Sequence, residues 1–239
     1  MKVDILAIGV HPDDVELSCS GTLLKHIDLG YKVGILDLTG GELGTRGTPE
    51  KRQREAESAA SLMGVEFRVN IGIPDGLFTN TEEYKMRIVK VIRKYRPEIV
   101  LANAIKDRHP DHGRSAQLVY DACFLSGLLK IGSTDAEGQL QDRWRPKAIY
   151  NYVQDQLLEP DIVIDITGYM DRKMETILAF KSQFYNPDSK EADSPISGLD
   201  FLEYIKARSR AYGRQIGVEF AEAFTSARPV GANDLFQLI

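Results

Sequence analysis

Residues 3–10 (VDILAIGV) and the tetrad that follows them, residues 11–14 (HPDD), decide the fold that this sequence predicts. The octet is an almost continuous apolar run, which is typical of a strand buried on both faces of a parallel sheet. A second such run, residues 98–103 (EIVLAN), lies shortly before a second tetrad, residues 109–112 (HPDH). Polar tetrads beyond two strand ends predict a site at the carboxyl edge of a parallel sheet, where α/β proteins bind ligands.

The rest of the chain alternates between strand and helix patterns. We expect further strands over residues 32–38, 66–71, 147–153 and 161–166, and helices over residues 21–29, 49–63, 82–95, 112–129, 169–184 and 199–212. Such alternation predicts parallel pairing through right-handed crossovers. We therefore predict an α/β fold, a Rossmann-like three-layer sandwich with a mostly parallel sheet. A single domain over residues 1–239 is expected, with helical additions and an unclassified tail from about residue 168.

The composition is that of an ordinary soluble globular protein, with 239 residues, 43% hydrophobic content and a net charge of −5. The acidic balance argues against nucleic-acid binding. No apolar run approaches the ~20 residues of a membrane span, and the first stretch is too short and too charged for a signal peptide. Two cysteines imply no disulfide framework. Neither a G-x-G-x-x-G fingerprint nor a P-loop is present. We expect a cytoplasmic protein without nucleic-acid or membrane partners.

Three of the chain's four histidines lie in the two tetrads, beside three aspartates. Imidazole and carboxylate groups gathered at strand ends are the ligands that divalent metals such as zinc use. A catalytic zinc site takes three protein ligands and leaves a position for water. We predict that His11, Asp14 and His112 supply these ligands to one Zn²⁺ per chain. The same donors suit Fe(II), Mn(II) or Co(II), so the sequence leaves the native metal open.

The other polar residues of the tetrads are predicted to carry the proton chemistry. Zinc lowers the pKa of bound water from about 15.7 to about 7, and Asp13, adjacent to a ligand, is predicted to be the general base. His109 is predicted to stabilise an oxyanion or to protonate a leaving amine. Asp111 is predicted to orient His109 by accepting a hydrogen bond from its ring. A competing structural role for Asp13 or Asp14 is to cap the helix that follows.

The two tetrads resemble the hallmarks of the PIG-L/LmbE-like family of zinc-dependent N-acetylglucosaminyl deacetylases. In many members an acidic residue follows the first tetrad directly, whereas here Val15 intervenes before Glu16. This spacing, with segments 44–56, 180–184 and 212–224, is most similar to the branch acting on N-acetylglucosaminyl-malate in bacillithiol biosynthesis. The resemblance implies hydrolysis of an N-acetyl amide by a homo-oligomeric enzyme. It assigns the same roles to His11, Asp13, Asp14, His109 and His112.

The substrate that this branch uses carries two carboxylates, and three arginines flank the predicted site in the sequence. Because arginine pairs bidentately with carboxylates, Arg46, Arg52 and Arg108 are predicted to bind substrate. Glu42 is predicted to hydrogen-bond a sugar hydroxyl. The alternative for each arginine is a solvated charge or an ion pair within the protein.

Three other functions stay open. The substrate could be a different N-acetylglucosamine conjugate, inositol-linked or an oligosaccharide, which would not need the arginines. A metal-dependent phosphoesterase would typically hold two metals and more carboxylates. A non-catalytic metal- or sugar-binding module would bind zinc without turnover. The loop that closes over the substrate is also open, with residues 131–146 and 185–198 as the two candidates.

Overall fold

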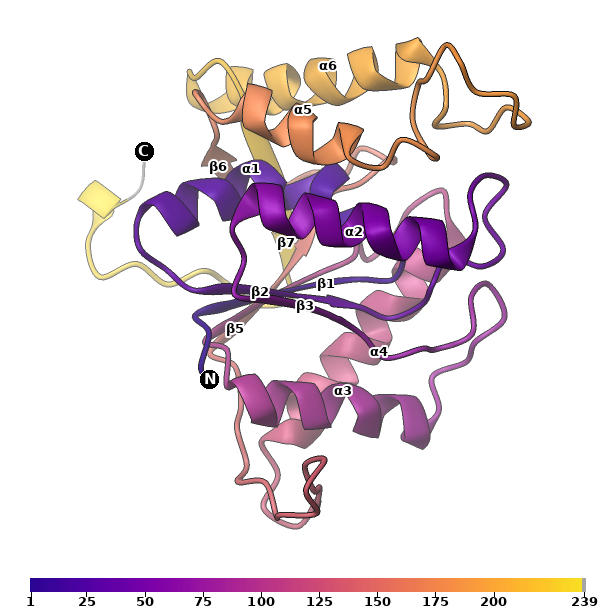
Figure 1. The fold of residues 1–239 in the computed structure, drawn as a ribbon. Helices are drawn as coiled ribbons and strands as arrows, with labels where there is room; N and C mark the ends of the chain where they lie inside the picture. The colour runs from indigo at the N-terminus through magenta and orange to yellow at the C-terminus, as the bar shows by residue number, and fades with distance from the viewer. Residues whose placement is uncertain (238–239) are drawn as a thin grey trace.

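A seven-stranded sheet lies between two layers of helices in the computed structural model, which describes residues 1–237 (Figure 1). The strands are β1 (Ile5–Gly9), β2 (Val33–Asp37), β3 (Phe67–Asn70), β4 (Ile99–Ala102), β5 (Ala148–Tyr152), β6 (Ile162–Asp165) and β7 (Ala221–Ser226). The helices are α1 (Asp14–Asp28), α2 (Pro49–Met63), α3 (Glu82–Tyr95), α4 (Pro110–Ser126), α5 (Met170–Leu178) and α6 (Leu199–Ile216), with a short 3-10 turn, η1 (Leu235–Gln237), in the tail.

The strand order is β3-β2-β1-β4-β5-β7-β6. The first five strands pair in parallel, while β7 runs antiparallel to both of its neighbours. β1 and β4 are adjacent, with Ile5 opposite Ile99, so the two tetrads follow neighbouring strands. The strand order reverses at this pair, which is where open α/β sheets bind ligands. The predicted Rossmann-like fold is confirmed.

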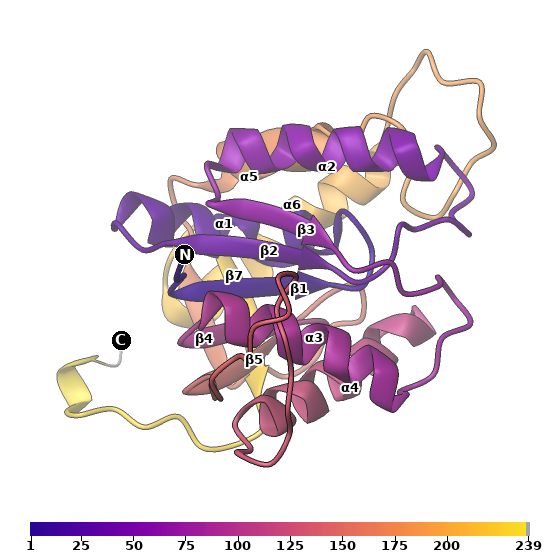
Figure 2. The same cartoon turned by 60° about the horizontal axis from the view of Figure 1, so that its bottom comes forward.

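Hydrophobic clusters fill the space between the sheet and the helical layer on each of its faces. Helices α3 and α4 cover one face of the sheet, and α1, α2, α5 and α6 lie on the other (Figures 1 and 2). All five residues of β1 are buried. Leu6 and Ile8 belong to the core shared with α3 and α4, whereas Ala7 packs into the core that holds Leu23 of α1. This two-residue alternation explains why a doubly buried strand reads as a continuous apolar run.

The two largest differences between predicted and observed helix boundaries arise because tertiary contacts override the local sequence pattern. α1 begins at Asp14 rather than near Gly21. Its polar first turns look like a loop in the sequence, yet Glu16 is fully buried and receives a hydrogen bond from Arg68. α5 ends at Leu178, and the chain beyond it turns so that Phe180 packs into the core beneath the helices instead of prolonging the helix.

The part of the chain beyond residue 168 contains more than helices and a tail, which corrects the prediction. β7 lies between β5 and β6 and completes the sheet. Its buried Glu222 accepts hydrogen bonds from the backbone N–H groups of Gly21 and Thr22 and from Lys173 Nζ, the last at 2.6 Å. Because this charged residue interrupts the apolar pattern of β7, the sequence alone does not indicate a strand there. No helix among residues 1–237 has the length and apolar content that crossing a membrane requires.

Candidate active site

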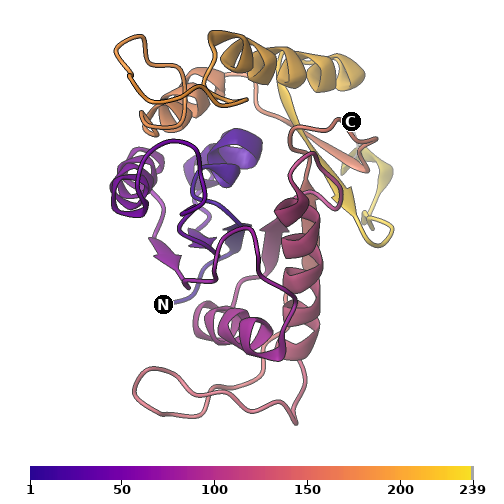
Figure 3. The same cartoon turned by 90° about the vertical axis from the view of Figure 1, so that its right-hand side faces the viewer.

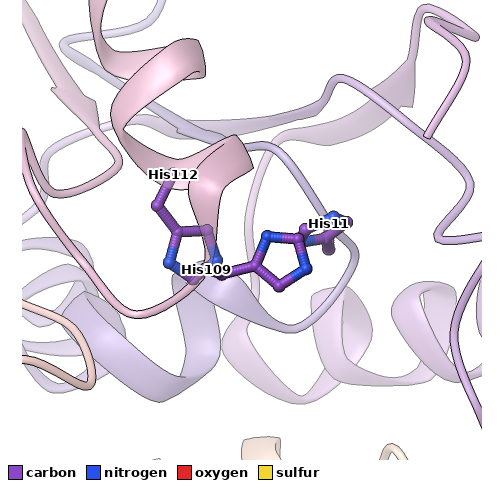
Figure 4. Close-up of side chains that lie close together, drawn as sticks. All are labelled: His11, His109 and His112. Atoms are coloured by element: carbon purple, nitrogen blue, oxygen red, sulfur yellow. The ribbon is translucent and has the colours of Figure 1, made fainter. Parts of the chain in front are cut away.

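The two tetrads meet at the carboxyl edge of β1 and β4, the edge that faces the viewer in Figure 3. His11 comes from the loop after β1, and His109 and His112 come from the start of α4 (Figure 4). The ring centre of His109 lies 4.7 Å from that of His11 and 5.2 Å from that of His112. One nitrogen atom of each ring lies within 4.8 Å of the others, close enough to share one metal ion.

The three residues predicted to ligate the metal lie together and are buried. Asp14 Oδ1 is 3.1 Å from His112 Nε2, and Asp14 Oδ2 is 3.7 Å from His11 Nδ1. Asn103 and Gln154 fix this carboxylate, because the amide of each donates a hydrogen bond to it, at 2.9 and 3.0 Å. His11 also forms a second metal-competent group with two other carboxylates, those of Asp75 and Asp111.

Each of the two predicted histidine ligands has a carboxylate on its other ring nitrogen. His11 Nε2 lies 2.9 Å from Asp75 Oδ1, and His112 Nδ1 lies 2.6 Å from Asp107 Oδ2. Metal-binding histidines usually pass their second ring N–H to such a partner, which fixes the tautomer. The donors that remain, His11 Nδ1, His112 Nε2 and the Asp14 carboxylate, are of the types that a divalent metal such as zinc takes as ligands.

The electrostatics of the cluster favour positive charge. Although burial lowers the pKa of His11, hydrogen bonds with Asp111 and Asp75 raise it to about 10. Burial likewise opposes the charged form of His112, but the Asp14 charge and the Asp107 hydrogen bond outweigh it and raise the pKa of His112 to about 9. Burial disfavours the Asp14 anion, yet the charge of His112 holds the pKa of Asp14 well below its usual range. A divalent cation satisfies this demand for positive charge as protons do.

Asp13 stands beside the ligand cluster in an unusual backbone conformation. Its φ of 119° is rare for a residue other than glycine and marks local strain. Its Oδ2 accepts a hydrogen bond of 3.0 Å from Arg52 Nη2. Burial raises the pKa of Asp13 to about 7, although the charge of Arg52 opposes the shift. The side chain is thus a buried carboxylate next to the predicted metal ligands, a position that suits the predicted general base.

Arg52 lies at the site but is engaged by the protein. Nη2 also donates to Pro12 O at 2.6 Å, and Nη1 donates to Gly41 O at 3.1 Å. The side chain is buried. Arg52 was predicted to bind a substrate carboxylate. In the structure its guanidinium instead binds the Asp13 carboxylate and the loops around it.

The hydrogen bond made by the His109 ring is that of a neutral imidazole with one N–H donor. Its Nδ1 accepts a hydrogen bond of 3.3 Å from the Asp111 backbone N–H, so the proton of the neutral ring sits on Nε2. Burial and the charges of His11 and His112 lower the pKa of His109. The predicted contact of the Asp111 side chain with His109 is wrong. That carboxylate instead lies 3.6 Å from His11 Nε2 and accepts hydrogen bonds from Gly76 N and Arg114.

A cavity of about 370 Å³ opens beside these groups. Four arginines line it, the three that the sequence predicts and one more, Arg208. Arg208 is buried and donates to the carbonyls of Gln154 and Leu17. Arg108, in contrast, has a side chain that is 52% exposed. Glu42 lies outside the cavity lining, since its carboxylate accepts hydrogen bonds from Gly40 N and Asp75 N, which does not support the predicted sugar contact.

The sequence analysis missed four residues that hold the predicted metal ligands in place. They are Asp75, Asn103, Asp107 and Gln154. Asp75 lies beyond β3, Asn103 and Asp107 lie beyond β4, and Gln154 lies just beyond β5. The signal that could have found them is therefore position, because each is a polar residue past the carboxyl end of a strand in the same sheet.

Replacing Asp107 with Asn should lower zinc affinity roughly 10- to 100-fold, as loss of an outer carboxylate usually does. The amide cannot supply the negative charge that raises the basicity of His112. Zinc competition with a chromophoric chelator measures the change. Asp142→Asn, which alters an exposed carboxylate paired with Arg96, serves as the matched control. Equal zinc affinity in both variants would contradict the role given to Asp107.

Comparison with known proteins places this arrangement in a family. The family model described as "PIG-L: GlcNAc-PI de-N-acetylase" matches residues 6–123, which include both tetrads. The crystal structure of the conserved protein TT1542 from Thermus thermophilus is 35% identical, has a TM-score of 0.84, and the match covers 96% of this chain and 97% of that one. The chain belongs to the PIG-L family.

Two further relatives of the chain are described as deacetylases of N-acetylated sugars. Diacetylchitobiose deacetylase of Thermococcus kodakarensis is 28% identical over 91% of this chain and 80% of its own length. A probable N-acetyl-α-D-glucosaminyl L-malate deacetylase 2 of Bacillus anthracis is 24% identical over 75% of this chain and 81% of its own. This PIG-L family member is thus an enzyme, a hydrolase of a deacetylase family with a site able to bind a metal.

Proposed function

We propose that the protein uses one Zn²⁺ per chain to remove the N-acetyl group of an N-acetylglucosamine conjugate, N-acetylglucosaminyl-malate in bacillithiol biosynthesis. One observation carries the reaction. The Asp14 carboxylate lies against His11 Nδ1 and His112 Nε2, and Asp13 lines the same cavity. When bound by this donor set, zinc polarises a carbonyl and lowers the pKa of water to about 7.

The chain's own residues supply the proton transfers of amide hydrolysis. Asp13, held by Arg52, accepts the proton of the attacking water. His109 Nε2–H donates to the oxygen that becomes negative as the amide carbonyl is attacked. The proton taken up by Asp13 then passes to the departing glucosamine nitrogen, so that acetate and a free amine result.

The anionic part of the substrate is assigned to Arg108 at the mouth of the cavity. Arg108 Nε donates to Asp155 Oδ2 at 2.5 Å, and Tyr204 Oη donates to the Asp155 backbone carbonyl. Within residues 1–237, Nη1 and Nη2 of Arg108 have no hydrogen-bond partner. Asp155 thus fixes the side chain and leaves the Nη1/Nη2 edge for a carboxylate, the geometry that favours bidentate pairing.

Replacing Arg108 with Gln should raise the KM for N-acetylglucosaminyl-malate by roughly tenfold, since a hydrogen bond to a charged group contributes about 1.5–3 kcal/mol. The KM for an uncharged conjugate should change little. Steady-state kinetics on both substrates make the comparison. Arg214→Gln, at an exposed arginine of α6, is the control. Equal effects of Arg108→Gln on charged and uncharged substrates would rule out a specific carboxylate contact.

The central test is amine release by zinc-loaded protein from N-acetylglucosaminyl-malate, free N-acetylglucosamine and diacetylchitobiose. Preference for the malate conjugate supports the whole proposal. Preference for diacetylchitobiose keeps the zinc deacetylase and replaces the substrate. Absence of turnover on all three, with zinc bound, would favour the phosphoesterase or the non-catalytic binding module.

The assembly and place of action are also proposed from the resemblance. We propose a homo-oligomer in the cytoplasm whose partner is the small sugar substrate, without nucleic-acid or membrane partners. Light scattering measures the mass of the assembly, and fractionation of cells that produce the protein shows its compartment. A monomeric mass or a membrane fraction would overturn the corresponding part.

A further inference from the structure

The segment after α5, residues 185–198, forms one wall of the cavity, and we call it the strap. Ser194, Pro195 and Ile196 of the strap line the cavity. The strap contains no helix or strand, and Ser197 is its one buried residue. In Figure 3 it is the orange loop on the side of the molecule that carries α2. The other candidate loop, residues 131–146, lies next to α3, where Gln141 donates to the Lys90 carbonyl.

A buried arginine on another loop holds the strap. Arg46 Nε donates to Ala192 O at 2.6 Å, and Nη2 donates to Asp193 Oδ1 at 3.0 Å and to Glu191 O at 3.4 Å. Arg46 is only 5% exposed and lines the cavity itself. Two of its three guanidinium nitrogens thus donate hydrogen bonds to three consecutive residues of the strap.

The contact is reciprocal. Gly47 N donates to Glu191 Oε2 at 3.1 Å, and Gln183 Nε2 donates to the Arg46 carbonyl at 2.7 Å. Gly47 has a φ of +74°, and a Cβ there would lie 2.7 Å from Ser182 Oγ, so the Arg46 loop approaches the segment that leads into the strap as closely as glycine allows. Ile196 packs against the hydrophobic cluster of α2, α5 and α6, but the strap otherwise buries little, so these polar contacts hold its residues 191–193 in place.

We propose that Arg46 is a specificity-determining residue, because it fastens the strap over the cavity and so limits the size of the conjugate that enters. This inference rests on the proposed deacetylase function. The cavity, with the strap as one wall, has a volume of about 370 Å³, near the lower end of the ~300–1,000 Å³ range of ligand sites. Such a space suits a single sugar with a small aglycone and excludes longer oligosaccharides. Releasing the strap removes that wall.

The first readout is independent of activity. Arg46→Ala and Glu191→Ala each break part of the fastening, and the second changes an exposed residue, so its fold is preserved even if the first variant is unstable. Trypsin cleavage after the exposed Lys190 of the strap should be at least tenfold faster in both. Arg54→Ala, at an exposed arginine of α2, should match the wild-type rate. Unchanged cleavage in both strap variants would overturn the proposal.

The second readout is the size profile of the substrates. The ratio of kcat/KM for tri-N-acetylchitotriose to kcat/KM for N-acetylglucosaminyl-malate should rise at least tenfold in Arg46→Ala and Glu191→Ala, and stay constant in Arg54→Ala. Faster cleavage with an unchanged ratio would overturn the specificity role. If wild-type protein deacetylates neither substrate, the proposed function fails. The cleavage rates would then still decide whether Arg46 fastens the strap.

Discussion

Asp13→Asn should reduce kcat by about 10²- to 10⁴-fold, the range that loss of a general base produces. Asparagine has the same shape as aspartate, and its side-chain oxygen can still accept the hydrogen bond from Arg52 Nη2. An amide oxygen, however, cannot take up a proton at neutral pH. Because Asp13 lies beside the ligand cluster rather than between the two imidazoles, KM and zinc content should change little. Steady-state kinetics together with metal analysis of the purified variant measure both quantities.

Asp14→Asn is the informative partner of this variant. Asp14 contacts both predicted histidine ligands, so its replacement should lower the zinc content as well as the activity. If Asp13→Asn loses zinc to the same degree as Asp14→Asn, then Asp13 is a ligand and the assignment of the base is wrong. If Asp13→Asn keeps full activity, the cavity works by a different base or serves a different reaction.

Removal of the metal should abolish turnover, with a loss of at least about a thousandfold. Arg52 cannot replace the metal at the amide carbonyl, because its guanidinium is bound to Asp13 and two backbone carbonyls. The imidazoles of His11 and His112 are paired with the carboxylates of Asp75 and Asp107. Electrophilic assistance therefore depends on the metal, which contributes several kcal/mol in such hydrolyses. Activity before dialysis against a chelator, after it, and after addition of Zn²⁺ is the measurement.

Restoration by different ions separates the alternatives. Zn²⁺ should restore activity at one ion per chain, whereas Mg²⁺ should not, since it prefers oxygen ligands in octahedral geometry. Zinc should also raise the melting temperature of the metal-free protein, as any ligand of the native state does. Two ions per chain, or activity that survives chelation, would speak against the proposed site and for a phosphoesterase or a metal-free reaction.

Much of the fold was predictable because the relevant signals are local. Apolar runs such as residues 3–10 mark doubly buried strands, and Thr48 and Pro49 mark the start of α2, where the Thr48 side chain accepts a hydrogen bond from Lys51 N. β7 was not predicted because Glu222 interrupts its apolar pattern. The buried carboxylate of Glu222 is stabilised by Lys173 of α5 and by two backbone N–H groups of α1. Such partners are distant in sequence, so no local pattern reveals them.

In the candidate site, too, some features follow from local sequence and others depend on the tertiary structure. The tetrads predict which residues assemble, and the structure brings His11, Asp14 and His112 together. The contacts around them depend on how loops fold. Arg46 and Arg52 look in sequence like free cations near an anionic substrate, yet one is bound to the strap and the other to Asp13. Sequence indicates the type of group at such a site, while its partner is a property of the tertiary structure.

The position of β7 has a consequence for how the polypeptide is made. Both tetrads leave the ribosome early, whereas β7, which separates β5 from β6, is the last of the described strands to be synthesised. Until it arrives, β6 lacks a neighbour in the described sheet and Lys173 lacks its carboxylate. A stop codon before residue 221 would therefore release a chain with both tetrads but an open β5 edge, which favours aggregation over a smaller working enzyme.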